Sequence, residues 1–444
     1  MNHEDLTIGK PWVVILRFAL PLMFACILQQ FYNTADTIIV GNFDSENSLA
    51  AVGSCFNLVG LYIMIAVGLS LGVGILISQA FGAKNEELMK KYAGNGCLFL
   101  IFSGIIISCF SYITAPWFLK NVIAVPQIIF EPAVLYAKIY SIGLFFQFGY
   151  NAFASVLRAV GNSKSSLYFL ILTTAVNIVL DLLFVITFQM SVAGVAIATT
   201  ISQAVAMLAS YIYLIKKYPL FKPTKKYWRL NYHLSIESAK NGLPLSLQAI
   251  IVNIGFMILL NIVNSFGTEM TVSFTVANRL EFYMLIPMIV LWDSVATFSG
   301  QNYGAKQPKR LIKGIKQTIF INLILALSIG VICFIFAQDL ASLFAIHGTS
   351  LEYATIHLRV VSCDLLFYAL YSPITAASVG VKKSYIVSVV SSIELAGRIL
   401  FAHILAPIIK EGSIWFNEPI AWGIVTVFVY MYYFIVLRKT ILNK

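Results

Sequence analysis

The sequence contains little charge. Asp, Glu, Lys and Arg together make up 11% of its 444 residues, whereas hydrophobic residues make up 59%. An average water-soluble domain carries about 25% charged residues. The composition therefore excludes an ordinary soluble protein and predicts a polytopic membrane protein.

Cysteine and histidine are also scarce, and neither forms a metal-binding or catalytic pattern. The five histidines are scattered along the chain, and no CxxC or DDxxD motif occurs. Without such clusters the sequence predicts no cofactor and no enzymatic activity. We interpret the cysteines, all of which fall in apolar runs, as small buried residues: Cys26, Cys55, Cys97, Cys109, Cys333 and Cys363.

Long apolar runs dominate the chain. Runs of about 20 residues or more, enough to cross the hydrocarbon core as helices, occur about twelve times. The start, MNHEDLTIGKPWVV, lacks the features of a cleaved signal peptide, so we expect the first run to stay in the membrane. The sequence thus predicts an all-α polytopic membrane protein with twelve transmembrane helices, over residues 12–40, 51–80, 93–115, 133–158, 165–188, 191–215, 241–266, 274–301, 314–337, 354–379, 385–408 and 419–437.

The positive charges lie on one side of this arrangement. Lys and Arg gather in alternate connections, among them 84–91, 216–240 and 306–316, while the other connections hold little more than Lys120 and Lys410. By the positive-inside rule, both chain termini and residues 216–240 are cytoplasmic. The net charge of +11 is therefore a signal of topology, and we expect no nucleic-acid partner.

The chain contains an internal repeat. A polar linker, 216–240, separates two halves of six runs each, 1–215 and 241–444. Because six is even, both halves begin on the same side of the membrane, so the repeat is parallel and predicts two six-helix bundles. Such bundles enclose a cavity and favour a transporter that works by alternating access. The matching stretches, at nearly constant offsets, are ALPL (19–22) with GLPL (242–245), SQAFGAKN (78–85) with GQNYGAKQ (300–307), and RAVGNSKSS (158–166) with ASVGVKKSY (377–385).

Polar residues inside the runs predict an ion site in the N-terminal half. Asp181 and Asn177 are four residues apart, so a helix places them on one face. Counted from the expected outer ends at ~1.5 Å per residue, Asp181 lies about 10 Å deep, Asp36 about 7 Å and Thr199 about 12–13 Å. Carboxylates in hydrocarbon are costly and usually face a partner or a cavity. We predict a cation site that takes up a proton or coordinates Na⁺; a hydrogen-bonded structural cluster is the alternative.

The C-terminal half carries acids of its own. Glu394 and Arg398 are four residues apart, and we expect them to form an internal ion pair. Glu281, Asp293 and Asp364 have no obvious partner at helical spacing. Each is a candidate for contact with a cationic substrate or a second proton, and local hydrogen bonding is the alternative.

Two prolines at matching positions predict bends. Pro21 and Pro244 both lie within apolar runs and are partners in the repeat. A proline inside a helix removes one backbone hydrogen bond and permits a kink. We interpret both prolines as hinges.

Together these features resemble the multidrug and toxic compound extrusion (MATE) family. The resemblance covers nearly the whole chain and rests on the two sets of six helices, on GQNYGAK at 300–306 and on its counterpart SQAFGAK at 78–84. It implies two bundles around a central cavity and a cation antiporter that works by alternating access.

The N-terminal half is similar to the DinF-like branch of that family. The cation site of this branch has an Asp in the first helix, Asn-x-x-x-Asp in the fifth and a Thr in the sixth. The residues that resemble this set are Asp36, Asn177, Asp181 and Thr199, and Pro21 resembles the proline that bends in that branch. The resemblance also implies lining roles for Gln29, Tyr32 and Asn151.

The C-terminal half departs from the NorM-type branch. That branch relies on a Glu in the seventh helix, and residues 241–266 contain none. Asp364 keeps an ion site in this half open, and Glu281 lies where drug exporters of the family often carry an acid.

These observations favour a cation-coupled antiporter, using H⁺ or Na⁺, that exports amphipathic and cationic small molecules. We expect it to act as a monomer in the bacterial plasma (inner) membrane. The main alternative is a lipid-linked oligosaccharide flippase of the same superfamily, which needs a cavity rich in cationic side chains. The candidates for such side chains are Arg279, Arg359 and Arg398.

The cytoplasmic location of residues 216–240 is testable by labelling. A cysteine introduced at Lys225 should not react with a membrane-impermeant maleimide added outside intact cells, because the Lys and Arg asymmetry places this linker inside. The same cysteine should react once the cells are permeabilised. Reaction in intact cells would contradict the predicted orientation.

Overall fold

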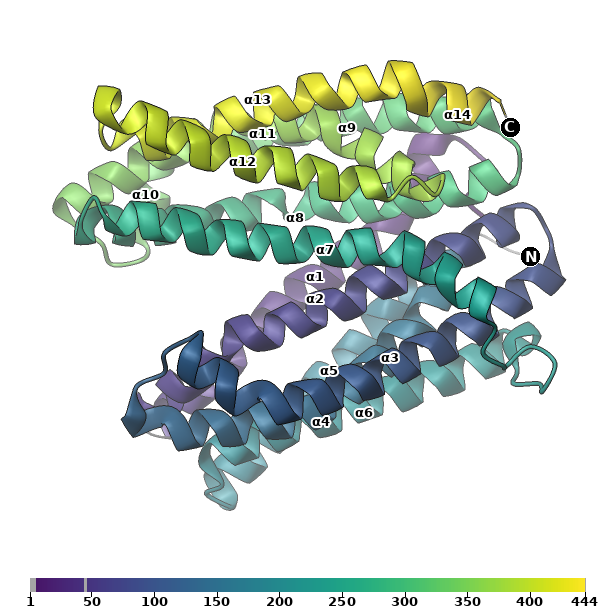
Figure 1. Ribbon diagram of the computed structural model, residues 1–444, viewed down its shortest axis with the longest axis horizontal. Coiled ribbons are helices and arrows are strands. Elements are labelled where there is room, and N and C mark those ends of the chain that lie inside the picture. Colours follow the sequence, from purple (N-terminus) through teal and green to yellow (C-terminus); the bar gives the residue numbers. More distant parts are fainter. Residues whose placement is uncertain (1–4, 44–45, 444) are drawn as a thin grey trace. The chain divides into compact units, whose positions relative to one another are not determined.

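The structure, a computed structural model, consists of helices and their connections. It describes residues 5–43 and 46–443, with side chains over the same residues except 31–46 and 57. All regular structure in this part of the chain is helical (Figure 1). In chain order the elements are α1 (Pro11–Phe43), α2 (Glu46–Gly82), α3 (Glu86–Asn121), α4 (Gln127–Ala159), α5 (Lys164–Asp181), η1 (Leu182–Thr187), α6 (Ser191–Lys217), η2 (Pro219–Phe221), α7 (Tyr232–Asn264), α8 (Thr268–Gly304), α9 (Pro308–Ile335), α10 (Ala337–Ser342), α11 (Gly348–Gly380), α12 (Tyr385–Ile409), α13 (Gly412–Tyr432), η3 (Tyr433–Leu437) and α14 (Arg438–Leu442).

The predicted fold class is confirmed. Twelve helical segments of the described residues are long and apolar enough to cross a membrane. Several helices extend well beyond the apolar runs that predict them. α7 begins at Tyr232, inside the predicted linker, and α3 runs from Glu86 to Asn121 where the run covers 93–115. Hydropathy detects the apolar middle of a helix, whereas hydrogen bonding continues into its polar ends.

The helices form two compact units. The N-terminal unit contains Leu20–Ser246, and the C-terminal unit contains Leu6–Ala19 together with Leu247–Lys444. The sequence predicts boundaries at 215/216 and 240/241 instead. The difference arises because the first part of α1 packs with the second unit and the first part of α7 packs with the first.

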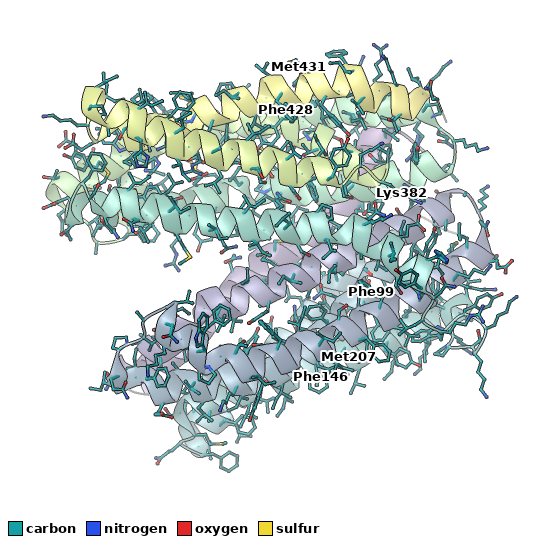
Figure 2. The ribbon with its side chains drawn as sticks, in the orientation of Figure 1. Phe99, Phe146, Met207, Lys382, Phe428 and Met431 are labelled. Carbon is teal, nitrogen blue, oxygen red and sulfur yellow. The ribbon has the colours of Figure 1, made fainter. Side chains whose placement is uncertain are left out.

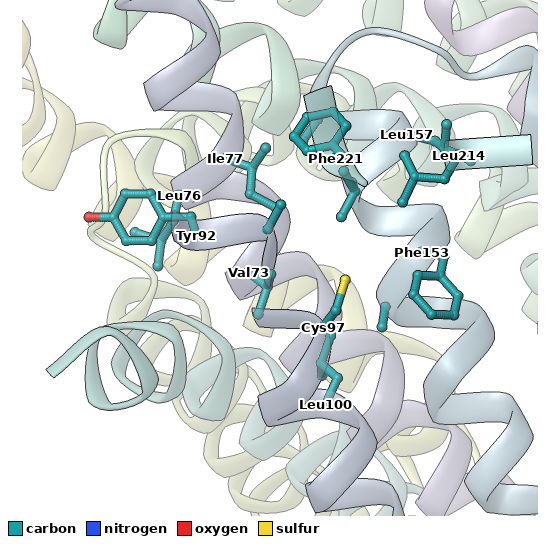
Figure 3. Packing of buried hydrophobic residues seen from close by; sticks show 14 of the residues in the cluster. Val73, Leu76, Ile77, Tyr92, Cys97, Leu100, Phe153, Leu157, Leu214 and Phe221 are labelled. Atoms are coloured by element: carbon teal, nitrogen blue, oxygen red, sulfur yellow. The ribbon is translucent and has the colours of Figure 1, made fainter. Parts of the chain in front are cut away.

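Apolar side chains from four helices fill the core of the N-terminal unit. Val73 and Leu76 on α2, Cys97 on α3, Phe153 on α4 and Leu214 on α6 are all buried and belong to one cluster (Figure 3). Every added buried methylene contributes roughly 0.8 kcal/mol in water. In a membrane the gain comes instead from close packing between the helices.

In the C-terminal unit α11 is the central helix. It packs against α8, α9 and α13, and α12 lies beside α13 (Figure 1). Met288 on α8, Ala326 on α9 and Leu365 on α11 are fully buried in a common cluster. Side chains on α11 are therefore positioned by three neighbouring helices at once.

Large apolar side chains also cover the outside of the helices. Ile113 on α3 is 74% exposed, Phe320 on α9 is 65% exposed and Met431 on α13 is 56% exposed. Figure 2 labels Met431 among the side chains of α13. A soluble protein rarely exposes so much contiguous apolar surface. We infer that these side chains contact the lipid tails of the bilayer.

The segment before α1 is held by hydrogen bonds to the repeated motif at the end of α8 and to the start of α9. The backbone amide of Leu6 donates to Gln301 Oε1 (2.9 Å), and Asn302 Nδ2 donates to the Leu6 carbonyl (3.2 Å). Arg310 donates to the carbonyls of Leu6 and Gly9. The motif GQNYGAK thus uses its two amide side chains to hold the incoming chain.

The start of α7 and the residue before it are held in the N-terminal unit by related hydrogen bonds. Asn95 Nδ2 on α3 donates to the Asn231 carbonyl (3.3 Å), and Ser235 Oγ donates to Asn95 Oδ1 (3.3 Å). In the C-terminal unit the backbone amide of Trp12 donates to Gln317 Oε1 (3.2 Å). Trp12 and Gln317 match Ser235 and Asn95 at the offsets of the repeated stretches. The repeat therefore includes the attachment of each half's first helix.

Two pairs of small residues bring α2 and α7 into close contact inside the N-terminal unit. A Cβ added to Gly72 would lie 2.4 Å from the backbone nitrogen of Gly242. One added to Gly68 would lie 2.5 Å from the backbone nitrogen of Ser246. Small residues spaced four apart on both helices allow the backbones to approach, as in other membrane helix pairs.

This contact predicts different effects for alanine substitutions at two glycines of α2. Gly72→Ala should lower the midpoint of thermal unfolding, because the two backbones must separate, and overpacking of this kind costs about 1–3 kcal/mol. Gly60→Ala is the matched control, since a Cβ there has nothing within 4 Å. Its midpoint should stay level or rise through better helix propensity. Equal midpoints for both variants in detergent would contradict the close α2–α7 contact.

Candidate functional site

The predicted ion-site residues of the N-terminal half are buried on two neighbouring helices. Asn177 and Asp181 on α5 are both 0% exposed, and Thr199 on α6 is 5% exposed. α5 and α6 pack along one another. Val179, between the two polar residues, is 63% exposed, so the polar face of α5 is the one turned into the protein.

The backbone changes form at Asp181. α5 ends at this residue, and the chain continues as a π-helix, Leu182–Thr187. A π-helix has more residues per turn than an α-helix, so it rotates the following side chains relative to the preceding face. Such turns occur frequently at functional sites. The sequence predicts an uninterrupted helix over 165–188 and does not reveal this feature.

Two of the predicted site residues fall where side chains are not described. Asp36 and Tyr32 both belong to α1, but their side chains lie outside the described residues. The meeting of Asp36 with Asp181 therefore stays a prediction. Gln29, on the same helix, is exposed.

Asn151 is buried on α4, but its amide serves its own helix. Its Nδ2 donates to the carbonyl of Gln147 at 2.9 Å. A polar link between α4 and α6 comes instead from Gln203, whose Nε2 donates to the hydroxyl of Tyr140 at 3.0 Å. The sequence analysis does not identify Gln203 or Tyr140, because uncharged side chains are not conspicuous in an apolar run.

The C-terminal unit contains a second buried polar group, around Arg398 on α12. Arg398 Nη1 lies 2.7 Å from Glu418 Oε1 on α13. The carboxyl groups of Glu281 on α8 and Asp364 on α11 interact electrostatically with both residues. Glu281 is 7% exposed, and Asp364 and Glu418 are each 1% exposed. We call Glu281, Asp364, Glu394, Arg398 and Glu418 the acid cluster.

The sequence predicts the wrong ion-pair partner for Arg398, namely Glu394 on the same helix. Arg398 pairs with Glu418, and Glu394 accepts a hydrogen bond from the indole nitrogen of Trp422 at 3.0 Å. Spacing of four residues places Glu394 and Arg398 on one face of α12. α13 packs along that helix, however, and both side chains reach across to it.

Glu418 stands one residue before the predicted span 419–437, so the sequence places it outside the membrane helices. α13 begins at Gly412, so Glu418 lies inside the helix and is buried. Pro419 looks like the start of a helix, whereas here it lies within one. The apolar stretch GSIWF before it is the signal that the helix begins earlier.

The other predicted residues, Asp293, Pro21 and Pro244, lie on three different helices of the structure, outside the acid cluster. Asp293 on α8 is half-buried and lies near the phenol of Tyr368. Pro21 lies inside α1, and Pro244 lies inside α7. Across the described residues, no three or more His, Cys, Asp or Glu side chains are grouped to hold a metal ion.

The chain is similar to known membrane proteins over its full length. The family model MatE matches residues 21–183 and 244–404. "Probable multidrug resistance protein YoeA" of Bacillus subtilis (strain 168) is 28% identical, over 97% of this chain and 96% of that protein. "Multidrug export protein MepA" of Staphylococcus aureus (strain NCTC 8325 / PS 47) is 22% identical, over 79% of this chain and 78% of that protein. The solved structure "Crystal structure of MATE in the bent conformation" has a TM-score of 0.93 and 22% identity, with both chains fully covered.

The ion pair in the acid cluster predicts an asymmetry between its two members. Arg398→Met should lower thermal stability strongly, by about 3–5 kcal/mol, because it leaves buried acids without a cation. Glu418→Leu should cost less, because Glu281, Asp364 and Glu394 remain near the guanidinium. The double variant should resemble Arg398→Met alone. Equal and additive losses, measured by thermal unfolding in detergent, would contradict a shared cation.

Proposed function

The chain belongs to the MatE family, and from that premise we propose that it exports amphipathic, cationic small molecules in exchange for a coupling cation. The match covers both halves of a multi-pass membrane protein, and each matched segment begins at a repeated proline, Pro21 or Pro244. Relatives named as multidrug resistance or export proteins support the substrate class. The site that carries the proposal is the buried carboxyl of Asp181.

Asp181 is the residue that binds the coupling ion. It is fully buried in a span whose mean hydropathy is 2.5, and Asn177 lies one turn away on the same face. A carboxylate in such surroundings is costly and marks an ion pathway in many transporters. Thr199 and Asp36 complete the set. With a proton, the carboxyls become neutral; with Na⁺, the oxygens of all four side chains replace water.

The acids of the C-terminal unit bind the positively charged group of the substrate. Glu281 and Asp364 are both buried members of the acid cluster, and Asp293 lies further along α8. Gln29, Tyr32 and Asn151 line the path in the N-terminal unit. A buried acid attracts an organic cation because the interaction is strong where the dielectric constant is low.

Alternating access uses α1 and α7 as hinges. Both helices are divided between the two units, α1 after Ala19 and α7 after Ser246. Pro21 and Pro244 lie within two residues of these divisions. A proline weakens the helix where it must bend, so the divisions support hinge roles for both.

The flippase alternative has less support. It needs cationic side chains free to bind a phosphorylated lipid, and two of the three candidates are engaged. Arg398 pairs with Glu418 amid several acids, and Arg359 stacks on the ring of Phe334 at 5.6 Å. We therefore retain the export of cations as the function, carried out by a monomer in the bacterial inner membrane with both termini cytoplasmic.

Asp181→Asn tests the proposal. The amide keeps the size of the side chain but cannot carry a proton or a negative charge, so gradient-driven efflux should fall to background. Asp36→Asn should behave alike. One charge crossing ~100 mV provides about 2.3 kcal/mol, and the variant loses access to that energy. Efflux is measured in vesicles with pH and sodium gradients imposed separately, which also identifies the coupling ion.

Asp339→Asn is the matched control, because Asp339 is an exposed acid on α10. It should export at the wild-type rate. Binding of the substrate to purified Asp181→Asn should persist, while its dependence on pH or sodium flattens. Normal efflux by well-expressed Asp181→Asn would refute the proposed ion site.

A further inference from the structure

A groove on the C-terminal unit is lined by none of the described residues of the acid cluster. It lies between α9, the last turns of α11 and the continuous segment of α13, η3 and α14, and its volume is ≈ 310 Å³. Its inner wall is apolar, because Ile315 and Ile374 line it and are each 1% exposed. A groove with such a wall can hold a hydrocarbon chain.

The groove opens on the apolar outside of the protein. Phe434, which lines it, is more than half exposed. Phe320 on α9 and Ile435 on η3, which border the lining residues in the sequence, are also more than half exposed. These side chains belong to the surface that we infer to contact lipid tails. The groove is therefore open to the bilayer, where lipids are the molecules at hand.

Two cationic side chains also line the groove. Lys316 belongs to α9 and Arg438 to α14, and both are exposed. α14 packs against α9, so the two cations come from neighbouring elements. Lysine and arginine bind phosphate groups through charge-assisted hydrogen bonds. The groove thus combines an apolar wall with groups that bind an anion.

A π-helix sets the position of Arg438. Its backbone amide donates to the carbonyl of Tyr433, five residues earlier, which is the hydrogen-bond spacing of a π-helix. Tyr433 and Arg438 both line the groove, whereas Leu437, which would follow Tyr433 by one turn of an α-helix, is fully buried. The wider turn therefore brings Arg438 to the groove. Single π-helical turns occur frequently at functional sites.

The stretches that build the groove carry positive charge alone. Residues 294–338, 365–393 and 419–443 contain five, two and two Lys or Arg residues and no Asp or Glu. They supply no carboxylate as a partner for Lys316 or Arg438, and their summed charge attracts anions. An organic cation is repelled from the same place.

We propose that this groove binds an anionic phospholipid. One acyl chain lies along Ile319, Ile374 and Phe434, and the phosphate group lies between Lys316 and Arg438. A basic pocket between membrane helices is a common form of site for such headgroups. The proposed cytoplasmic location of the C-terminus assigns this lipid to the inner leaflet, whereas the site itself does not rest on the proposed export.

Native mass spectrometry of the purified full-length protein tests the site, with dioleoylphosphatidylglycerol as the probe. The wild type should bind one molecule more tightly than it binds dioleoylphosphatidylcholine, which has the same acyl chains but no net charge. Lys316→Gln and Arg438→Gln should each lower the affinity by about tenfold or more, because each removes a charge-assisted hydrogen bond. Both side chains are exposed, so both variants should keep the wild-type midpoint of thermal unfolding without added lipid.

The double variant Lys313→Gln, Lys439→Gln is the matched control. It removes the same two charges from α9 and α14, and both side chains are exposed, but neither is among the described residues that line the groove. Its affinity should fall by about twofold at most, because salt screens exposed charges that make no contact. Equal losses in the control and in the double variant Lys316→Gln, Arg438→Gln would show an effect of surface charge alone and would overturn the proposal.

Two further outcomes would also overturn it. Equal affinities for the two lipids would show that the groove does not recognise an anion. Displacement of the bound lipid by inorganic phosphate would identify a site for the free ion, in which the acyl chain has no part. We expect inorganic phosphate to leave the lipid bound, because the apolar wall of the groove contributes to its affinity.

Discussion

The absence of water from the bilayer core is the constraint on which this structure depends. Every backbone amide and carbonyl in the membrane must find its partner within the protein, and a helix provides these partners within a single segment. The same rule acts on side chains, because a polar group that faces lipid has nothing to bind. Asp181 and Asn177 are accordingly turned away from the face that exposes Val179, and Glu281, Asp364 and Glu418 are buried among four helices. The acids of both units therefore face the protein interior.

The two units meet that constraint with different chemistry. In the N-terminal unit the predicted site combines the buried side chains of Asn177, Asp181 and Thr199. In the C-terminal unit an arginine from α12 lies among carboxyl groups from α8, α11 and α13. An internal repeat therefore preserves helix order and attachment, while its polar interiors have diverged.

Many features of the fold can be predicted from the sequence, and the features that cannot be predicted depend on contacts between helices. Apolar runs predict twelve spans, because hydrophobic length is a property of the chain itself. The partner of Arg398 is not predictable in this way: spacing of four residues describes neighbours on one helix, whereas Glu418 belongs to another. Tyr232 begins α7 within a polar stretch because packing, rather than hydropathy, holds that turn. The π-helix after Asp181 depends on its surroundings and has no residue that announces it.

The exchanged first segments of α1 and α7 also set the order in which the protein can be completed. Leu6 and Arg310 are separated by 304 positions, and yet Arg310 donates a hydrogen bond to the Leu6 carbonyl within the C-terminal unit. At roughly 5–20 residues per second, a ribosome needs about 15–60 s to make the second after the first. Throughout that interval the start of the chain has no α8 or α9 to hold it. The N-terminal unit likewise lacks the first part of α7 until Ser246 is made. Each unit therefore needs residues from both halves of the sequence before it is complete.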